Sequence, residues 1–384
     1  MELDLTWILL GLPMAFGLGW LASRLDLRQL RIANRQAPRA YFKGLNYLLN
    51  EQQDQAIDAF IEAVQNDPDT SELHFALGNL FRRRGEYDRA VRVHEHLLSR
   101  ADLSNADRQR AQHGLALDYL KAGLLDRAEE ALRKLEGTSY EGQARLARLA
   151  IYERSREWPE AARVAHLLEN SGEANFSVRM AHYLCEQARE AVQMGDAAKA
   201  LQLLTQATQN APDAPRPRIL LGQLQLAQGQ AQAAFDTLRD LFTRHDAAAP
   251  LAAASLVKAA QAANQSSQAL SALQTFYAQQ PCIDVLEAMT TLAQNDPAAQ
   301  AASHQRYLDH LQKQSSLMAA SRWLNGQPDQ SPLPAPVQKA LENATRPLAR
   351  YRCAACGFEA KEHFWHCPGC QAWDSYPPRR VEEL

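Results

Sequence analysis

Four cysteines near the end of the 384-residue chain have the spacing of a metal site. Cys353 and Cys356 form one CxxC pair, and Cys367 and Cys370 form a second pair after ten intervening residues. Each pair makes a tight turn that presents two sulfurs to one ion, and the two pairs together complete a tetrahedron. Four thiolates suit Zn²⁺ or a single iron, and the sequence does not choose between them. The spacing therefore predicts one metal ion, iron or zinc, bound by four cysteines.

The role expected of this ion is structural rather than redox. A segment of about thirty residues cannot build a core by itself, so the ion supplies its folding energy, about 10 kcal/mol in comparable peptides. Gly357 follows its cysteine where the turn needs positive φ, and Gly369 lets backbone amides face the thiolates. His363 and His366 are left out as ligands because four cysteines fill the coordination sphere. The nearby aromatic residues are expected to pack around the ion or against the rest of the chain: Tyr351, Phe358, Phe364, Trp365, Trp373 and Tyr376.

Catalytic chemistry is hard to find in the rest of the chain. His94 and His96 lie two positions apart, on different faces of a helix, and the HExxH spacing is absent. There is no glycine-rich phosphate loop and no serine elbow, and Cys185 and Cys282 are expected to be small buried hydrophobic residues. Lys and Arg (41) nearly balance Asp and Glu (44), so no basic face for nucleic acid is indicated. We expect no catalytic residues and no nucleic-acid partner.

A repeated pattern organises most of the chain. One alanine, which opens the second helix of a helical pair, recurs at intervals of 34, 38, 33, 39, 34 and 35 residues: Ala56, Ala90, Ala128, Ala161, Ala200, Ala234 and Ala269. Twelve residues earlier several units have another small residue: Gly44, Gly78, Ala116, Ala188 and Gly222. Turn glycines separate the two positions at Gly85, Gly123, Gly195 and Gly229. This is the tetratricopeptide pattern of two antiparallel helices per unit.

The expected fold is therefore all-α, a right-handed tetratricopeptide solenoid over residues 38–324. One helical hairpin cannot bury its apolar face alone, so neighbouring units stack and leave a concave surface. Seven units are legible to about residue 281, and the stretch from Cys282 to Leu324 is expected to be a degenerate pair and a cap. First helices line the concave wall, so in the second unit we expect Phe75, Asn79, Arg82 and Arg83 to point inward and bind a partner.

The N-terminal segment has the composition of a membrane anchor. Residues 5–22 are an uncharged apolar run of 18, about 27 Å long as a helix and just enough to cross a bilayer. Two acidic residues precede it and a basic stretch follows, so the positive-inside rule places the amino terminus outside and the remainder in the cytoplasm. We expect a transmembrane anchor over 1–23 and a basic cytoplasmic juxtamembrane segment over 24–37; a signal peptide or a buried soluble helix are the alternatives.

The composition changes again after Trp323. Five prolines mark a semi-rigid linker over residues 325–349, with one short helical stretch at Val337–Ala344. The metal-binding domain then occupies residues 350–384. A cytoplasmic location argues against disulfides between its cysteines.

These three parts in this order resemble the lipopolysaccharide assembly protein B family. The most specific stretches are Gly78–Ala90 (GNLFRRRGEYDRA), Tyr351–Phe358 (YRCAACGF) and Trp365–Trp373 (WHCPGCQAW). The resemblance implies a rubredoxin-type domain with the four cysteines as ligands, and a single-pass protein of the cell inner membrane that regulates lipopolysaccharide synthesis without catalysis. It implies as partners the zinc deacetylase that commits lipid A synthesis, an FtsH-type membrane protease and other lipopolysaccharide assembly membrane proteins.

Two other functions stay open at this point. One is a general tetratricopeptide scaffold for a different envelope assembly. The other is a rubredoxin-like electron carrier, which would require iron with a reversible couple.

Overall fold

The computed structural model describes residues 16–17, 20, 42–66, 70–172, 174–293, 297–325 and 333–384. The expected anchor and the basic segment, 1–23 and 24–37, lie almost wholly outside these residues. Within the described ranges, no helix is both long enough and apolar enough to cross a bilayer. The chain divides into two compact units, residues 1–151 and 152–384, each considered by itself.

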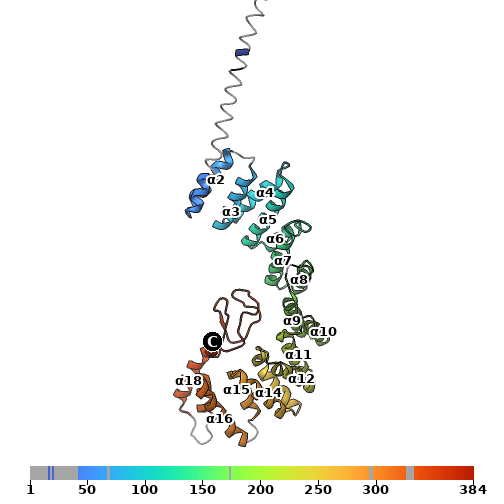
Figure 1. Ribbon diagram of the computed structural model, residues 1–384, viewed down its shortest axis with the longest axis vertical. Coiled ribbons are helices and arrows are strands. Elements are labelled where there is room, and N and C mark those ends of the chain that lie inside the picture. Colours follow the sequence, from blue (N-terminus) through green and yellow to red (C-terminus); the bar gives the residue numbers. More distant parts are fainter. Residues whose placement is uncertain are drawn as a thin grey trace, which may run out of the picture. The chain divides into compact units, whose positions relative to one another are not determined.

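The described part of the chain is mostly α-helical, as the repeat pattern predicts (Figure 1). In the first unit residues 42–49 are helical, and α2 (Gln53–Asn66), α3 (Ser71–Arg84), α4 (Tyr87–Ser99), α5 (Asn105–Ala122), α6 (Leu125–Arg133) and most of α7 (Glu141–Ser155) follow. The second unit contains α8 (Trp158–Asn170), α9 (Ser177–Gln193), α10 (Ala197–Asn210), α11 (Pro215–Ala227), α12 (Ala231–Thr243), η1 (Ala249–Ala252), α13 (Ala253–Ala262), α14 (Ser266–Gln279), α15 (Ile283–Leu292), α16 (Pro297–Lys313), α17 (Leu317–Asn325), α18 (Ala335–Leu348), β1 (Tyr351–Arg352), β2 (Glu359–Ala360) and η2 (Val381–Glu383).

The seven repeated alanines are fully buried in the helical pairs. Each lies near the start of an even-numbered helix and is 0% exposed: Ala56, Ala90, Ala128, Ala161, Ala200, Ala234 and Ala269. The small residue on the preceding helix is equally constrained, because a Cβ added at Gly222 would lie 2.5 Å from Cγ of Leu238. The tetratricopeptide pairing inferred from the spacing is confirmed.

A left-handed residue ends the first helix of every pair. Four of these residues are the expected glycines, with φ between 76° and 85°. Glu51, Arg156 and Asn264 occupy the same place in the other three units, with φ of 59°, 62° and 56°. The turn position therefore repeats with the spacing of the buried alanines, although glycine marks only part of the series.

The stretch from Cys282 to Leu324 forms three helices, α15 to α17, and the last residues of the chain hold two of them. Arg380 donates to both oxygens of Asp284, at 2.8–3.2 Å, near the start of α15. Glu383 accepts from the Ile283 amide at 2.7 Å, and Glu382 accepts from the Met318 amide at 3.0 Å. Carboxylates at helix N-termini satisfy amides that have no partner within the helix.

The proline-containing linker is more helical than its composition suggests. Helix α18 runs from Ala335 to Leu348, beyond the expected Val337–Ala344, and packs against α17. Pro336 lies in its first turn, where the missing N–H costs nothing, and Pro347 lies in its last turn. Tyr351 follows almost immediately and begins the metal-binding domain.

Candidate metal centre

The four cysteines of the two CxxC pairs meet at one point. Their Sγ atoms all lie within 4.8 Å of one another. The Sγ atoms of Cys353 and Cys370 are 3.8 Å apart, and those of Cys356 and Cys367 are 3.7 Å apart. A tetrahedron with metal–sulfur bonds of about 2.3 Å has sulfurs about 3.8 Å apart. The donor set and its spacing therefore fit one tetrahedral ion.

Two equivalent turns hold the sulfurs in place. The amide of Gly357 donates to the carbonyl of Cys353, and the amide of Gln371 donates to the carbonyl of Cys367, both at 2.9 Å. Gly357 has φ +78° and Gln371 has φ +62°. The expected role of Gly357 is confirmed, and Gln371 performs the same role in the second turn. The antiparallel pair β1–β2 frames the first turn, with Tyr351 opposite Ala360.

The electrostatics of the cluster favour a bound cation. Burial opposes ionisation of Cys353, but hydrogen bonds with Ser375 and with the amides of Cys356 and Ala355 outweigh it and hold the pKa of this thiol below its usual value. At Cys356 the Phe358 amide favours the thiolate, yet partial desolvation and the neighbouring sulfurs outweigh it and raise the pKa. Four thiolates this close cannot all ionise without a compensating positive charge. A metal ion would supply that charge and tie both turns together.

Both histidines beside the cysteines have other roles. His363 Nε2 donates to the carbonyl of Tyr376 at 3.0 Å, and burial lowers the pKa of its imidazole. His366 stacks on Trp373 with ring centres 4.3 Å apart. Tyr351 and Tyr376 are buried around the cysteines, whereas Phe358 is 44% exposed and covers Gly369 of the second turn with one side of its ring.

The metal-binding domain is docked on the repeats of the second unit. Trp373 Nε1 donates to Glu153 at 3.0 Å, and the Trp373 ring stacks on His182 of α9, with centres 4.8 Å apart. His182 Nε2 donates to Asp374 at 2.9 Å, while His182 Nδ1 lies 3.3 Å from a guanidinium nitrogen of Arg216 on α11. The sequence marked Trp373 as a packing residue but gave no sign of its partners, which lie more than 190 residues away.

The four residues expected to bind a partner take different positions in the first unit. Phe75 is 2% exposed and lies under Arg110, whose guanidinium is 4.1 Å from the ring centre. Arg82 donates to Asp118 at 2.8 Å and also pairs with Asn79, so both are used within the protein. Arg83 is exposed. Phe75 packs in a core cluster with Leu97 and Ala111, so its ring is not available on the surface.

His94 and the lone cysteines are structural, as expected. The His94 ring lies between Gly78 and Gly114, where an added Cβ would approach it to 2.6 Å, and its Nδ1 contacts Asp118. Cys185 and Cys282 are buried, and burial raises the pKa of each thiol to about 12.

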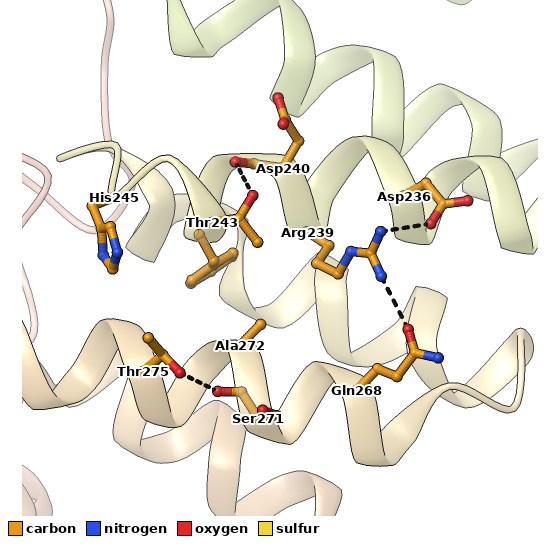
Figure 2. Close-up of a pocket in the computed structure, with 10 residues that line it drawn as sticks. Asp236, Arg239, Asp240, Thr243, His245, Gln268, Ser271, Ala272 and Thr275 are labelled. Carbon is orange, nitrogen blue, oxygen red and sulfur yellow. Dashed lines mark hydrogen bonds and ion pairs between the residues drawn. The ribbon is translucent and has the colours of Figure 1, made fainter.

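A hollow of about 520 Å³ lies between α12 and α14 (Figure 2). Its central Arg239 pairs with Asp236 at 3.3 Å and donates to Gln268 at 3.0 Å. Thr243 and Thr275 donate to backbone carbonyls of their own helices. The bond between Arg239 and Gln268 crosses the hollow, whereas the two threonines are satisfied within their own helices. Nδ1 of His245, which also lines the hollow, is buried without a hydrogen-bond partner in the described part of the chain.

The fold and the cysteine site define a tetratricopeptide repeat protein with a rubredoxin-type metal-binding domain. Residues 351–377 match the family described as "Rubredoxin metal binding domain", and residues 43–94 and 191–254 match tetratricopeptide repeat families. "Lipopolysaccharide assembly protein B" of Escherichia coli (strain K12) is 30% identical over 98% of both chains. The protein of that name from Haemophilus influenzae is 26% identical over 97% of this chain and 98% of its own.

The chain belongs to the lipopolysaccharide assembly protein B family. A solved tetratricopeptide repeat protein from Parabacteroides merdae is 14% identical, covers 67% of this chain and 99% of its own, and has a TM-score of 0.35.

Proposed function

We propose that this chain is a non-enzymatic adaptor of the inner membrane that regulates lipopolysaccharide synthesis. It binds the zinc deacetylase that commits lipid A synthesis and presents it to an FtsH-type membrane protease. The observation that carries the proposal is the full-length similarity to lipopolysaccharide assembly protein B of Escherichia coli, over 98% of both chains. The stacked repeats support it, because such arrays offer extended surfaces for binding other proteins.

The mechanism is proximity. Residues 1–23 confine the repeats to the membrane surface, where the protease and other lipopolysaccharide assembly proteins reside. Two weak contacts, one with the deacetylase and one with the protease, then act as one strong contact through effective concentration. The metal-binding domain contributes by holding the repeats that it contacts in a fixed arrangement.

Crosslinked co-purification from membranes tests the partners directly, and removal of residues 1–23 tests the tether. The truncated chain should still capture the deacetylase, whereas degradation of the deacetylase in cells should slow. As a matched control, an unrelated single-pass anchor in place of residues 1–23 should restore degradation. Unchanged degradation with the soluble form would reject the tether, and a pull-down lacking both partners would favour a scaffold for another assembly.

A further inference from the structure

Three hollows in the second unit adjoin one another beside the metal-binding domain. The first, about 280 Å³, lies between α9 and α11. The second, about 660 Å³, lies between α7–α9, α11 and the metal-binding domain. The third, about 390 Å³, lies between α11 and the same domain. Leu220 and Gln223 of α11 line all three, so the hollows adjoin one another along this helix; we name them together the α11 groove.

One end of the α11 groove is apolar. Val192 of α9, Leu204 of α10 and Leu220 and Leu224 of α11 line it. Val192 is 49% exposed, so an aliphatic side chain remains in contact with solvent there. Covering such a surface with aliphatic side chains of a partner removes apolar area from water.

The other end, which we call the cationic end, has four arginines (Arg154, Arg156, Arg189 and Arg216) against three glutamates (Glu153, Glu186 and Glu362) in its lining. Arg154, Arg156 and Arg189 are exposed at its rim, and buried Arg216 lies on its floor. Glu186 pairs with both Arg216 and Arg189, and Glu153 accepts from Trp373 and Tyr183. Within the described residues neither Arg154 nor Arg156 has an ion-pair partner. Two further polar atoms lining this end, Nε of Arg216 and Nε2 of His366, are buried without a hydrogen-bond partner in the described part of the chain. Buried polar atoms without a hydrogen-bond partner are uncommon in native proteins.

One wall of the groove belongs to the metal site itself. Cys367, Pro368 and Gln371 of the second metal turn line the cationic end, opposite the repeat helices. The cationic end therefore exists in this form only while the metal-binding domain is folded and docked, whereas the apolar end is lined by the repeat helices alone.

We propose that the α11 groove binds a segment of a partner protein in which acidic residues are followed by aliphatic ones. The carboxylates face Arg154, Arg156 and Arg189, and the aliphatic side chains cover Val192, Leu220 and Leu224. Charge complementarity sets the direction of the segment along the groove. The proposal rests on the adaptor role described above and assigns the residues by which that role is carried out.

The direct test uses the full chain in detergent and the labelled peptide Gly-Glu-Glu-Asp-Glu-Ala-Leu-Val-Leu-Ala, followed by fluorescence anisotropy. The double variant R154E/R156E and, separately, V192D should each weaken binding by about tenfold or more, because like charges and a buried carboxylate oppose the peptide. Binding should also fall with salt. A peptide with lysine in place of the acidic residues should bind far more weakly.

Matched controls keep the result specific. Arg92 is an exposed arginine of α4 in the first unit, and Val178 is 46% exposed on α9 but lines none of the three hollows. R92E and V178D should stay within about twofold of the unmodified chain. Absence of peptide binding, equal binding by the groove variants, or capture of anionic lipid vesicles through Arg154 instead of peptide would overturn the proposal.

Co-purification separates this proposal from the adaptor function. If the unmodified chain and the groove variants capture the deacetylase equally well, the groove assignment is wrong and the adaptor function stands. If the unmodified chain captures no deacetylase, the adaptor function fails and the peptide measurement alone decides the groove.

Discussion

At the scale of single residues, the sequence predicts one of the two polar clusters, the metal cysteines, but not the other. The four metal cysteines are visible because each pair is local, and a CxxC turn has one common use. The cluster of Arg82 with the buried His94 and Asp118 cannot be recognised in the sequence, because its members come from three helices and resemble any other polar residues. Its burial follows from the glycines on either side of His94, which leave room for a ring.

Loss of one metal ligand should release the ion. Cys367→Ser replaces a thiolate by a hydroxyl, which is a poor ligand for zinc or iron, and the turn that it anchors should unfold. Elemental analysis should show about one ion per unmodified chain and none in the variant. The control Cys185→Ala, at a buried cysteine of α9, should retain the ion. Iron with a reversible couple would instead support an electron carrier.

Removal of the buried negative charge in the first unit should be costly. Asp118 is 0% exposed and is the partner of both Arg82 and His94. Asp118→Asn removes the partner charge of Arg82, whose side chain is only 18% exposed, and should destabilise the first unit by about 3 kcal/mol. Urea unfolding followed by circular dichroism measures the effect.

The control for that variant is an exposed ion pair. Asp102 pairs with Arg100 at 2.6 Å, but its side chain is 67% exposed. Asp102→Asn should change the free energy of unfolding by less than about 0.5 kcal/mol. Equal changes in the free energy of unfolding at the two positions would show that the Asp118 cluster stabilises the protein no more than an exposed ion pair does.

At the scale of the helical pair, the backbone conformation of the turn residue repeats in every unit, whereas its residue type does not. The turn position is left-handed in all seven units, whether it holds glycine or not. A non-glycine residue there costs about 1–2 kcal/mol, and asparagine tolerates the conformation best. A search for glycine alone therefore misses three of the seven turns, whereas the spacing from the buried alanines finds them all.

Substitutions at two of these turns should have opposite signs. Gly195→Ala places a Cβ on a residue with φ +81° and should destabilise the second unit by about 1 kcal/mol. Glu51→Gly relieves the same conflict at φ +59° and should stabilise the first unit by about 0.5 kcal/mol. Thermal unfolding of the full chain measures both. Destabilisation by Glu51→Gly would mean that the glutamate side chain makes a compensating contact.

At the scale of the whole molecule, the sequence predicts the features that depend on local spacing. It does not predict the features that depend on contacts between residues far apart in the chain. The repeats and the cysteine turns depend on spacings within about forty residues, so they are legible. The docking of the metal-binding domain depends on Trp373, Asp374 and Arg380 meeting residues of α7, α9 and α15, and nothing in a single sequence pairs them. The cationic end of the α11 groove arises from that docking, so the sequence does not predict it either.

The docked domain should stabilise the repeats it touches. Trp373 packs against Trp158 and His182, and Trp365 lies near Arg216, so α8, α9 and α11 each contact the metal-binding domain. Removal of the metal unfolds the turns that carry both tryptophans, and the three helices lose these contacts. Amide hydrogen exchange should therefore accelerate in α8, α9 and α11 after chelation, and remain unchanged in α3, α4 and α5.

A substitution that spares the metal separates docking from metal binding. Trp373→Ala keeps all four cysteines but removes the ring that stacks on His182 and the hydrogen bond to Glu153. It should retain its ion and still reproduce the faster exchange in α8 and α9, because the contact rather than the metal protects these helices. Faster exchange on chelation without any effect of Trp373→Ala would mean that another part of the domain holds the repeats. Unchanged protection in both experiments would show that the repeats of the second unit are stable without the metal-binding domain, which would then serve a separate partner.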